Sequence, residues 1–324
     1  MNQLDLSSFS VRVAHRHTVG DDIVVLDLVA SDGLPLPPFT AGAHVELQLQ
    51  AGPRQYSLCN DPRDASCYRI AVHRVANGRG GSAEVYDAVQ PGQLIPVRGP
   101  FNHFEMVPGA TEVLLLAGGI GITPVLAMAH SCHAQSLPFA LHYSGRTLAR
   151  MAFAQELLDS PLAPHVQLHA DDGQGAQPLA LDATIGAHTP GKHLYVCGPQ
   201  GMIEAVRASA KAQGWPDASV HFEHFGSNAA APRADDGSFE VQLASSGRCI
   251  RIAPEQTVAQ ALQAEGIHIP VSCGAGVCGA CRTRIVAGTP DHRDLFYSPE
   301  EQARGDEFTP CCSRALSPVL VLDL

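Results

Sequence analysis

A chain of 324 residues is long enough for two or three domains, and its 45% of hydrophobic residues suffices to fill their cores. The net charge of −11 at pH 7 gives no indication of a nucleic-acid-binding protein, which would carry a basic patch. No apolar run reaches the ~18 residues of a membrane-spanning helix, and the first residues lack the basic and apolar regions of a signal peptide. We therefore expect a cytoplasmic chain with no membrane contact, whose ten cysteines serve metal binding or remain free thiols.

The first hundred residues predict an antiparallel β-barrel or sandwich. Apolar and polar residues alternate over short runs, at residues 9–13, 23–28, 44–49 and 68–72, and turn residues separate the runs. Many short strands at this spacing are typical of such folds. We place this first domain at residues 1–103.

Two motifs in this domain indicate a site for a ring that carries a phosphate. They are Arg54, Tyr56 and Ser57 at the end of a strand, and Gly80, Gly81 and Ser82 before a helix expected at residues 83–89. A helix N-terminus with a serine cap binds anions, and the Arg54 guanidinium can hold the same phosphate with two hydrogen bonds. Tyr56 can stack on a flat ring while Ser57 hydrogen-bonds the edge of the ring. An ordinary strand tyrosine and an ordinary glycine turn explain these residues equally well.

From about residue 111 the pattern changes to alternating strands and helices. Buried strands at residues 113–116, 139–143, 166–168 and 194–196 alternate with helices at 124–130, 152–158 and 202–213. This alternation predicts an α/β domain with a parallel sheet, which we place at residues 104–226.

Two turns at the ends of these strands indicate a nucleotide. One carries Gly118, Gly119, Gly121, Thr123 and Pro124, and the other carries Cys197, Gly198 and Pro199. The first turn departs from the dinucleotide fingerprint, because Pro124 stands where the last glycine would be. Ligands of open α/β sheets bind at the carboxyl ends of strands, so we expect both turns to face one site. A glycine turn that serves helix packing alone is the alternative.

The last domain follows a linker of small, polar and unpatterned residues at 227–237. We place this domain at residues 238–324. It begins with a strand at 239–243, continues with a helix at 258–265, and closes with a strand at 319–322.

Within the last domain, Cys273, Cys278 and Cys281 have the C-x4-C-x2-C spacing of a plant-type [2Fe–2S] cluster. A loop that wraps a cluster needs unusual φ angles and leaves no room for side chains, which explains the small residues between the cysteines. A structural zinc site favours paired C-x2-C knuckles and fits this spacing poorly. The fourth ligand is Cys311 or Cys312, with twenty-nine or thirty residues after Cys281, and the spacing alone does not choose between them.

Taken in chain order, these motifs resemble those of the phthalate dioxygenase reductase family, which includes vanillate demethylase reductases. The resemblance covers essentially the whole chain. It implies a multidomain protein with an FMN-binding antiparallel β-barrel, a parallel-sheet NAD domain of the ferredoxin–NADP reductase type, and a C-terminal α+β ferredoxin domain of the β-grasp type. It also favours Cys311 as the fourth ligand, because twenty-nine residues is the common gap in plant-type ferredoxins.

The same resemblance implies roles for individual barrel and NAD-domain residues. Arg54 and Ser82 would hold the FMN phosphate, while Tyr56 and Ser57 would contact the ring. Thr123 would lie near flavin and nicotinamide. Phe225 would shield the flavin ring, although a core phenylalanine explains that residue nearly as well.

The type of pyridine nucleotide depends on two features that point in different directions. Arg146 ends the second strand of the parallel sheet, where a carboxylate would select NAD, and it can tolerate a 2′-phosphate or pair with a phosphate of NAD. Asp171 and Asp172 end the next strand and disfavour NADP. The family resemblance implies NADH.

NADH gives two electrons together as hydride, a [2Fe–2S] cluster accepts one at a time, and FMN can do both. The resemblance therefore implies the NADH-dependent reductase component of a two-component Rieske-type aromatic oxygenase or demethylase. The terminal oxygenase would be a separate partner, and the reductase a monomer. A reductase for a separate haem monooxygenase and a non-enzymatic redox sensor are the alternatives.

Overall fold

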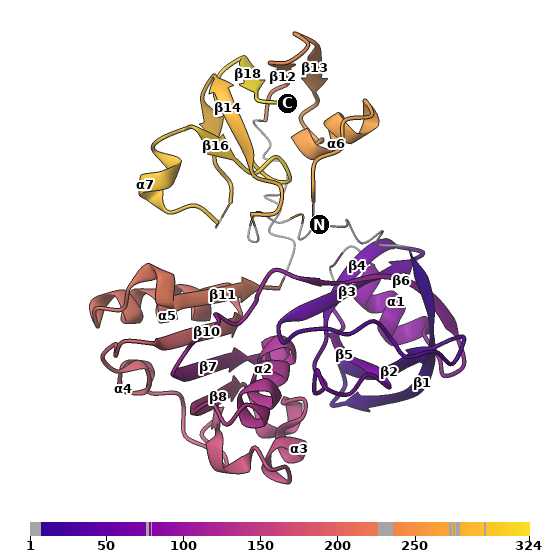
Figure 1. The fold of residues 1–324 in the computed structure, drawn as a ribbon, viewed down its shortest axis with the longest axis vertical. Coiled ribbons are helices and arrows are strands. Elements are labelled where there is room, and N and C mark those ends of the chain that lie inside the picture. Colours follow the sequence, from indigo (N-terminus) through magenta and orange to yellow (C-terminus); the bar gives the residue numbers. More distant parts are fainter. Residues whose placement is uncertain are drawn as a thin grey trace. The chain divides into compact units, whose positions relative to one another are not determined.

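A computed structural model describes residues 8–75, 78, 80–225, 236–271, 274, 276, 279–294 and 296–324 (Figure 1). The chain divides into two compact units, Met1–Phe225 and Gly226–Leu324. Two predicted cluster ligands, Cys273 and Cys278, lie outside the described residues.

The first unit begins with an antiparallel sheet of strand order β4-β3-β6-β1-β2-β5. Its strands are β1 (Phe9–Val19), β2 (Ile23–Ala30), β3 (Ala43–Leu49), β4 (Gly52–Ser57), β5 (Tyr68–His73) and β6 (Leu94–Asn102). The end strands β4 and β5 lie close together, which curls the sheet into a barrel. Helix α1 (Gly81–Ala88) packs Val85 into the aliphatic barrel core, and Figure 1 shows it against these strands. The predicted antiparallel barrel is confirmed.

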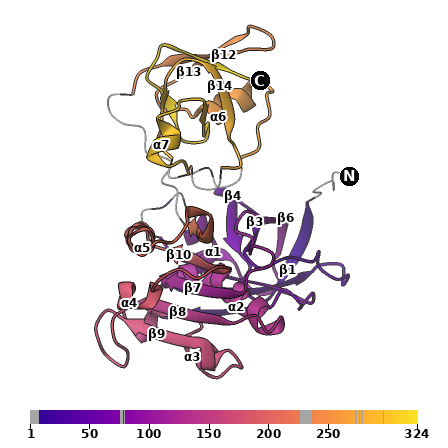
Figure 2. The same ribbon diagram turned by 60° about the vertical axis from the view of Figure 1, so that its left-hand side comes forward.

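A parallel sheet of strand order β11-β10-β7-β8-β9 follows in the same unit (Figure 2). Its strands are β7 (Glu112–Gly118), β8 (Phe139–Gly145), β9 (Val166–Ala170), β10 (Lys192–Gly198) and β11 (Val220–His224). The α-helices are α2 (Ile122–Ala134), α3 (Ala154–Leu158), α4 (Leu181–Ile185) and α5 (Gln200–Ala212), and the 3-10 turns are η1 (Gly119–Gly121), η2 (Leu148–Arg150), η3 (Ala163–His165) and η4 (Asp217–Ser219). The predicted α/β domain is confirmed.

Strand β7 shows why its sequence is apolar without alternation. Successive side chains of a strand point to opposite faces. Leu115 is buried in a core that includes α2, whereas Leu114 and Leu116 are buried in a second core that includes α4 and α5. Both faces of the strand are therefore covered, as expected for a parallel sheet between helices.

The helices of this sheet differ in their bounds from the sequence prediction. Helix α2 begins at Ile122, two residues before Pro124. Proline is tolerated in the first turn of a helix because the N–H that it lacks would have no partner inside the helix. Helix α3 begins at Ala154 instead of residue 152, because Phe153 takes a left-handed φ of 63°. Helix α4 was not predicted; it has only five residues and too little periodicity.

The second unit is an α+β domain around a mixed sheet of order β13-β12-β18-β14-β16. Its strands are β12 (Phe239–Leu243), β13 (Cys249–Ile252), β14 (Thr283–Ala287), β16 (Glu307–Phe308) and β18 (Val319–Leu322), with β15 (Pro290–Asp291) and β17 (Arg314–Ala315) as a separate pair. Helix α6 (Val258–Ala264) packs Leu262 into the core, and α7 (Pro299–Gln302) is a single turn. A capping box of Thr257 and Gln260 fixes the start of α6. The predicted ferredoxin-type domain is confirmed.

Candidate cofactor sites

The barrel brings its two predicted motifs together. Arg54 lies on β4, and its side chain covers the first turn of α1. A Cβ on Gly81 would stand 2.5 Å from the Arg54 Cγ and 2.7 Å from its Nε. Gly80 is the N-cap of α1, with a left-handed φ of 86° that favours glycine. Glycine at both positions lets the arginine approach a helix N-terminus, where the first N–H groups attract anions.

Ser82 does not cap this helix, so that part of the prediction is wrong. Gly80 takes the N-cap position, and Ser82 lies within the first turn of a helix that begins earlier than expected. Its hydroxyl accepts a hydrogen bond from the Val75 N–H at 3.1 Å. Ser82 therefore ties the helix start to the segment that follows β5.

Tyr56 and Ser57 leave β4 on opposite faces, because side chains of a strand alternate. Tyr56 shares the face of Arg54 and is half-buried against the barrel core, and burial raises the pKa of its phenol. Ser57 is buried in a register position opposite His44 of β3. The structure therefore groups Tyr56 with Arg54 and directs the Ser57 side chain to the other face.

The two glycine turns of the parallel sheet lie in contact. Strands β7 and β10 are parallel neighbours, so their carboxyl ends meet at one edge of the sheet. A Cβ on Gly121 would stand 2.2 Å from the Cys197 carbonyl oxygen, and a Cβ on Gly118 would stand 2.8 Å from the Pro199 Cδ. No side chain fits between the turns, which explains both glycines. Gly119, between them, has a left-handed φ of 54°.

Two polar side chains at this edge are buried. The Thr123 hydroxyl, in the first turn of α2 beside Pro124, donates to the Ile120 carbonyl at 3.1 Å and closes the turn. The Cys197 thiol is fully buried, and burial raises its pKa well above the usual value, so that it stays a neutral thiol at pH 7. Phe225 follows β11 and packs, partly buried, against the core that contains α2.

Arg146 and Asp171 lie where β8 and β9 end, at the same edge of the sheet. The Asp171 N–H donates to the Gly145 carbonyl at 3.0 Å, and the Asp172 N–H donates to the Arg146 carbonyl at 3.3 Å. Both aspartates are exposed. One cation and two carboxylates therefore lie on two loops that hydrogen-bond to each other.

The described part of the cysteine loop has the backbone that a cluster loop requires. Gly274, Gly276 and Gly279 all take left-handed φ angles, of 64°, 71° and 66°. A Cβ on Gly276 would stand 2.3 Å from the Cys312 Sγ, and one on Gly279 would stand 2.4 Å from the Phe296 ring. The conformation and the close packing both explain why this loop carries glycines.

Cys281, Cys311 and Cys312 are buried together beside this loop. The Cys312 sulfur lies 3.2 Å from the Thr309 hydroxyl oxygen, which lies 3.0 Å from the Ser313 hydroxyl oxygen. Hydrogen bonds, led by one with Cys311, lower the pKa of Cys312. Buried thiols beside a glycine loop of this conformation fit an iron–sulfur cluster.

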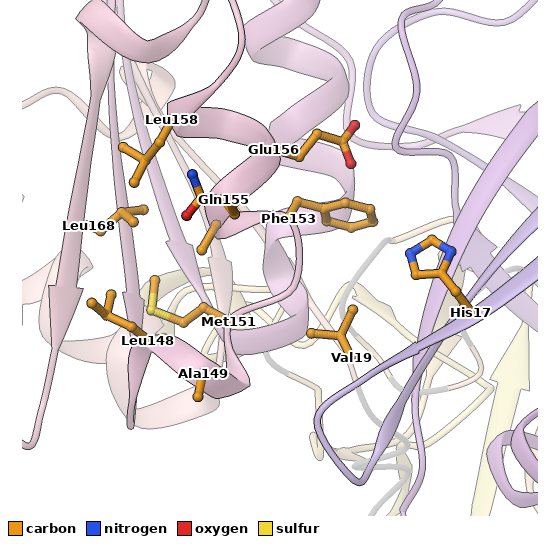
Figure 3. A pocket seen from close by; sticks show the side chains of 11 residues that line it. His17, Val19, Leu148, Ala149, Met151, Phe153, Gln155, Glu156, Leu158 and Leu168 are labelled. Atoms are coloured by element: carbon orange, nitrogen blue, oxygen red, sulfur yellow. The ribbon is translucent and has the colours of Figure 1, made fainter.

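A cavity of about 510 Å³ in the first unit was not predicted (Figure 3). His17 and Val19 line it from β1, while Met151, Phe153 and Leu168 line it from the α/β domain. Figure 3 shows the rings of Phe153 and His17 on facing elements. Sequence reasoning missed it because its two walls lie far apart along the chain.

The chain combines two features. Its parallel sheet carries glycine turns suited to a nucleotide at the carboxyl ends of the strands, and its ferredoxin-type domain carries a cysteine loop. Together they define an electron-transfer oxidoreductase. Residues 115–208 match the family model of the oxidoreductase NAD-binding domain, and residues 241–316 match that of the 2Fe-2S iron-sulfur cluster binding domain. Among the described residues, no helix is both long and apolar enough to span a membrane.

Relatives of known name cover nearly the whole chain. The vanillate O-demethylase oxidoreductase of Pseudomonas sp. (strain HR199 / DSM 7063) is 47% identical over 97% of this chain and 99% of its own length. The phthalate dioxygenase reductase of Burkholderia cepacia is 36% identical over 97% of both chains. The chain belongs to the family of oxygenase reductases that these two proteins represent, as its motifs predicted.

Solved structures agree with this membership. A structure of phthalate dioxygenase reductase, described as modular for electron transfer from pyridine nucleotides to [2Fe-2S], has a TM-score of 0.76, 36% identity and 98% coverage of both chains. An intact type IV self-sufficient cytochrome P450 monooxygenase has a TM-score of 0.80 and 36% identity over 98% of this chain. This chain covers 41% of that longer protein.

Proposed function

We propose that this chain is the NADH-dependent reductase component of a two-component Rieske-type oxygenase or demethylase that acts on an aromatic compound. The observation that carries the proposal is that one chain contains both an oxidoreductase NAD-binding domain and a 2Fe-2S cluster binding domain. A nicotinamide releases a hydride, whereas a cluster accepts single electrons, so a carrier between them is required. FMN on the barrel supplies this conversion when bound.

The barrel residues hold the flavin in this proposal. The Arg54 guanidinium and the start of α1 at Gly80, Gly81 and Ser82 bind the phosphate, and the contact between Arg54 and Gly81 supports this assignment. Tyr56 stacks on the ring. Ser57, Thr123 and Phe225 line the space around the reacting rings.

The edge of the parallel sheet binds NADH in this proposal. The site consists of the two glycine turns and the loops after β8 and β9, with Gly118, Gly119, Gly121, Thr123, Pro124, Arg146, Asp171, Cys197, Gly198 and Pro199 as its residues. The close contact of the two turns supports a single site. The exposed carboxylates of Asp171 and Asp172 oppose a 2′-phosphate and favour NADH over NADPH; equal kcat/KM values for the two nucleotides would contradict this preference.

The cluster ligands in this proposal are Cys273, Cys278, Cys281 and Cys311. The joint burial of Cys281 and Cys311 supports the pair. The gap of twenty-nine residues after Cys281, common in plant-type ferredoxins, favours Cys311 over Cys312 as the fourth ligand.

The relatives support a separate oxygenase as the electron acceptor, because their names are those of reductase components for demethylases and dioxygenases. A reductase for a haem monooxygenase is the second candidate, and the similarity to the self-sufficient P450 favours it. We propose that the chain is cytoplasmic, since a reducing compartment keeps the predicted free thiols reduced. We also propose that it is a monomer. Sedimentation analysis tests the monomer.

The test uses the full chain loaded with FMN and iron–sulfur cluster. NADH should reduce the flavin and then produce the electron paramagnetic resonance (EPR) signal of a reduced [2Fe–2S] cluster. Electrons should then reach a Rieske-type oxygenase in preference to a haem monooxygenase. Preference for the haem enzyme would favour the second candidate. Negligible turnover with both cofactors loaded would instead favour a redox sensor.

A further inference from the structure

Glu84 joins the predicted phosphate-binding helix to the hairpin that carries Arg54. Glu84 lies in the first turn of α1, and its two carboxylate oxygens accept one backbone hydrogen bond each. Its Oε1 accepts from the Gln50 N–H at 2.8 Å, and its Oε2 accepts from the Ala51 N–H at 2.8 Å. Both amides belong to the turn between β3 and β4. One carboxylate therefore binds helix and hairpin together.

These contacts form a closed arrangement around the helix start. Beyond the turn, β4 carries Arg54, whose side chain lies against Gly81 in the first turn of α1. A Cβ on Gly80 would stand 3.4 Å from the Ala51 Cβ, so the hairpin turn also packs beside the N-cap. The helix start and the guanidinium thus have fixed relative positions, and Glu84 provides two hydrogen bonds that fix them.

We propose that Glu84 is a positioning residue for the flavin phosphate. It aligns the first N–H groups of α1 with the Arg54 guanidinium so that both reach the same phosphate. A bidentate arginine and a helix N-terminus depend on direction, so a shift of the helix against the hairpin weakens both contacts at once. This inference rests on the proposed FMN site and deepens it.

The Glu84 carboxylate also has an effect that opposes its positioning role. The direction in which FMN affinity changes in a Glu84 variant therefore tests the proposal. The negative charge of the carboxylate, one turn from the phosphate, repels a bound phosphate. At a half-exposed site this repulsion is small, because water and salt screen it. Two hydrogen bonds from backbone amides to a charged acceptor are worth more, and their loss disturbs the geometry. Positioning and repulsion therefore predict changes of FMN affinity in opposite directions.

The test compares FMN with riboflavin, which lacks the phosphate. Flavin-free full-length chain and its E84Q and E84A variants are titrated with each flavin, and binding is followed by flavin fluorescence. We expect E84Q to weaken FMN binding roughly tenfold, E84A to weaken it at least as much, and riboflavin binding to stay unchanged. D87N is the matched control on the same helix, because Asp87 pairs with Arg74 at 2.9 Å instead of the hairpin, and it should bind both flavins like the parent chain.

Three outcomes would overturn the inference. FMN affinity that is unchanged or higher in E84Q would show that the carboxylate only repels the phosphate or is without effect. Equal losses for FMN and riboflavin would show a general loss of barrel structure. A parent chain that binds riboflavin as tightly as FMN would overturn the phosphate site of the proposed function itself, and this outcome is recognisable before any variant is made.

Discussion

Asp236, in the segment predicted to be a linker, lies in a buried charge network of the second unit. The side chains of Asp236 and Arg293 are each 5% exposed. The Arg293 guanidinium donates two hydrogen bonds to the carboxylate, one of them at 2.9 Å, and a third to Asp291 at 2.7 Å. Arg314 donates to the Gly237 carbonyl at 3.0 Å. The end of the predicted linker is therefore fixed to the ferredoxin domain.

We predict that D236N destabilises the second unit by about 3 kcal/mol. The substitution keeps the shape of the side chain but leaves the buried Arg293 with one carboxylate partner instead of two, and breaking a buried ion pair costs ~3–5 kcal/mol. Because Asp291 remains as a partner of Arg293, we expect the loss of stability to lie at the lower end of this range. For a domain of about 100 residues, such a loss lowers the midpoint of thermal unfolding by roughly 12–24 °C.

The assay is thermal unfolding of the full chain, with cluster absorbance reporting on the second unit and flavin fluorescence on the first. Only the cluster transition should move in D236N. D323N is the matched control, because Asp323 pairs with Arg284 at 3.8 Å on the surface, where an ion pair contributes ~0–1 kcal/mol. A shift in D236N no larger than that of D323N would refute the reasoning.

Three further predictions concern the cluster, the nucleotide and pH. C311S should abolish the EPR signal of the cluster yet leave flavin reduction by NADH intact, whereas C312S should keep the cluster; the reverse result would assign Cys312 as the ligand. G121A should lower kcat/KM for NADH at least tenfold without changing the cluster spectrum, because its Cβ would stand 2.2 Å from the Cys197 carbonyl oxygen; an unchanged kcat/KM would contradict a tight contact between the turns. Burial lowers the pKa of His142, which lies beside His169, to about 4, so the neutral form stabilises the fold at high pH and this contribution is lost as pH falls from about 6.5 to about 4. The urea midpoint of the first unit should fall over that range, and less steeply in H142Q; equal slopes would show that His142 does not contribute.

The sequence sufficed for the fold class and for the place of each motif along the chain, because these depend on local chemistry. Burial on both faces makes β7 a continuous apolar run, and left-handed angles at Gly274, Gly276 and Gly279 require glycine whatever surrounds them. The NAD and 2Fe-2S domains are confirmed by the family models. The roles of individual site residues stay predictions.

Local patterns failed where a backbone angle or a distant partner decides the outcome. Serine is a residue type that often caps helices, which made Ser82 the expected N-cap of α1. The left-handed φ of Gly80 instead places the N-cap two residues earlier in the chain, at Gly80. Asp236 looks like an unpatterned linker residue, and only Arg293, which is far along the chain, shows that it is buried. The burial of Asp236 leaves no trace in the residues nearby.

The amino-acid sequence by itself determined the fold class, the longer helices and the residue types at the predicted strand ends, because these depend on neighbours along the chain. Only the tertiary structure decided which of those ends meet. Arg54 reaches Gly81, Gly121 packs against Cys197, and Glu84 binds the hairpin turn through packing between segments that are distant in sequence. Such contacts depend on how the sheets close and stack, which no local pattern encodes.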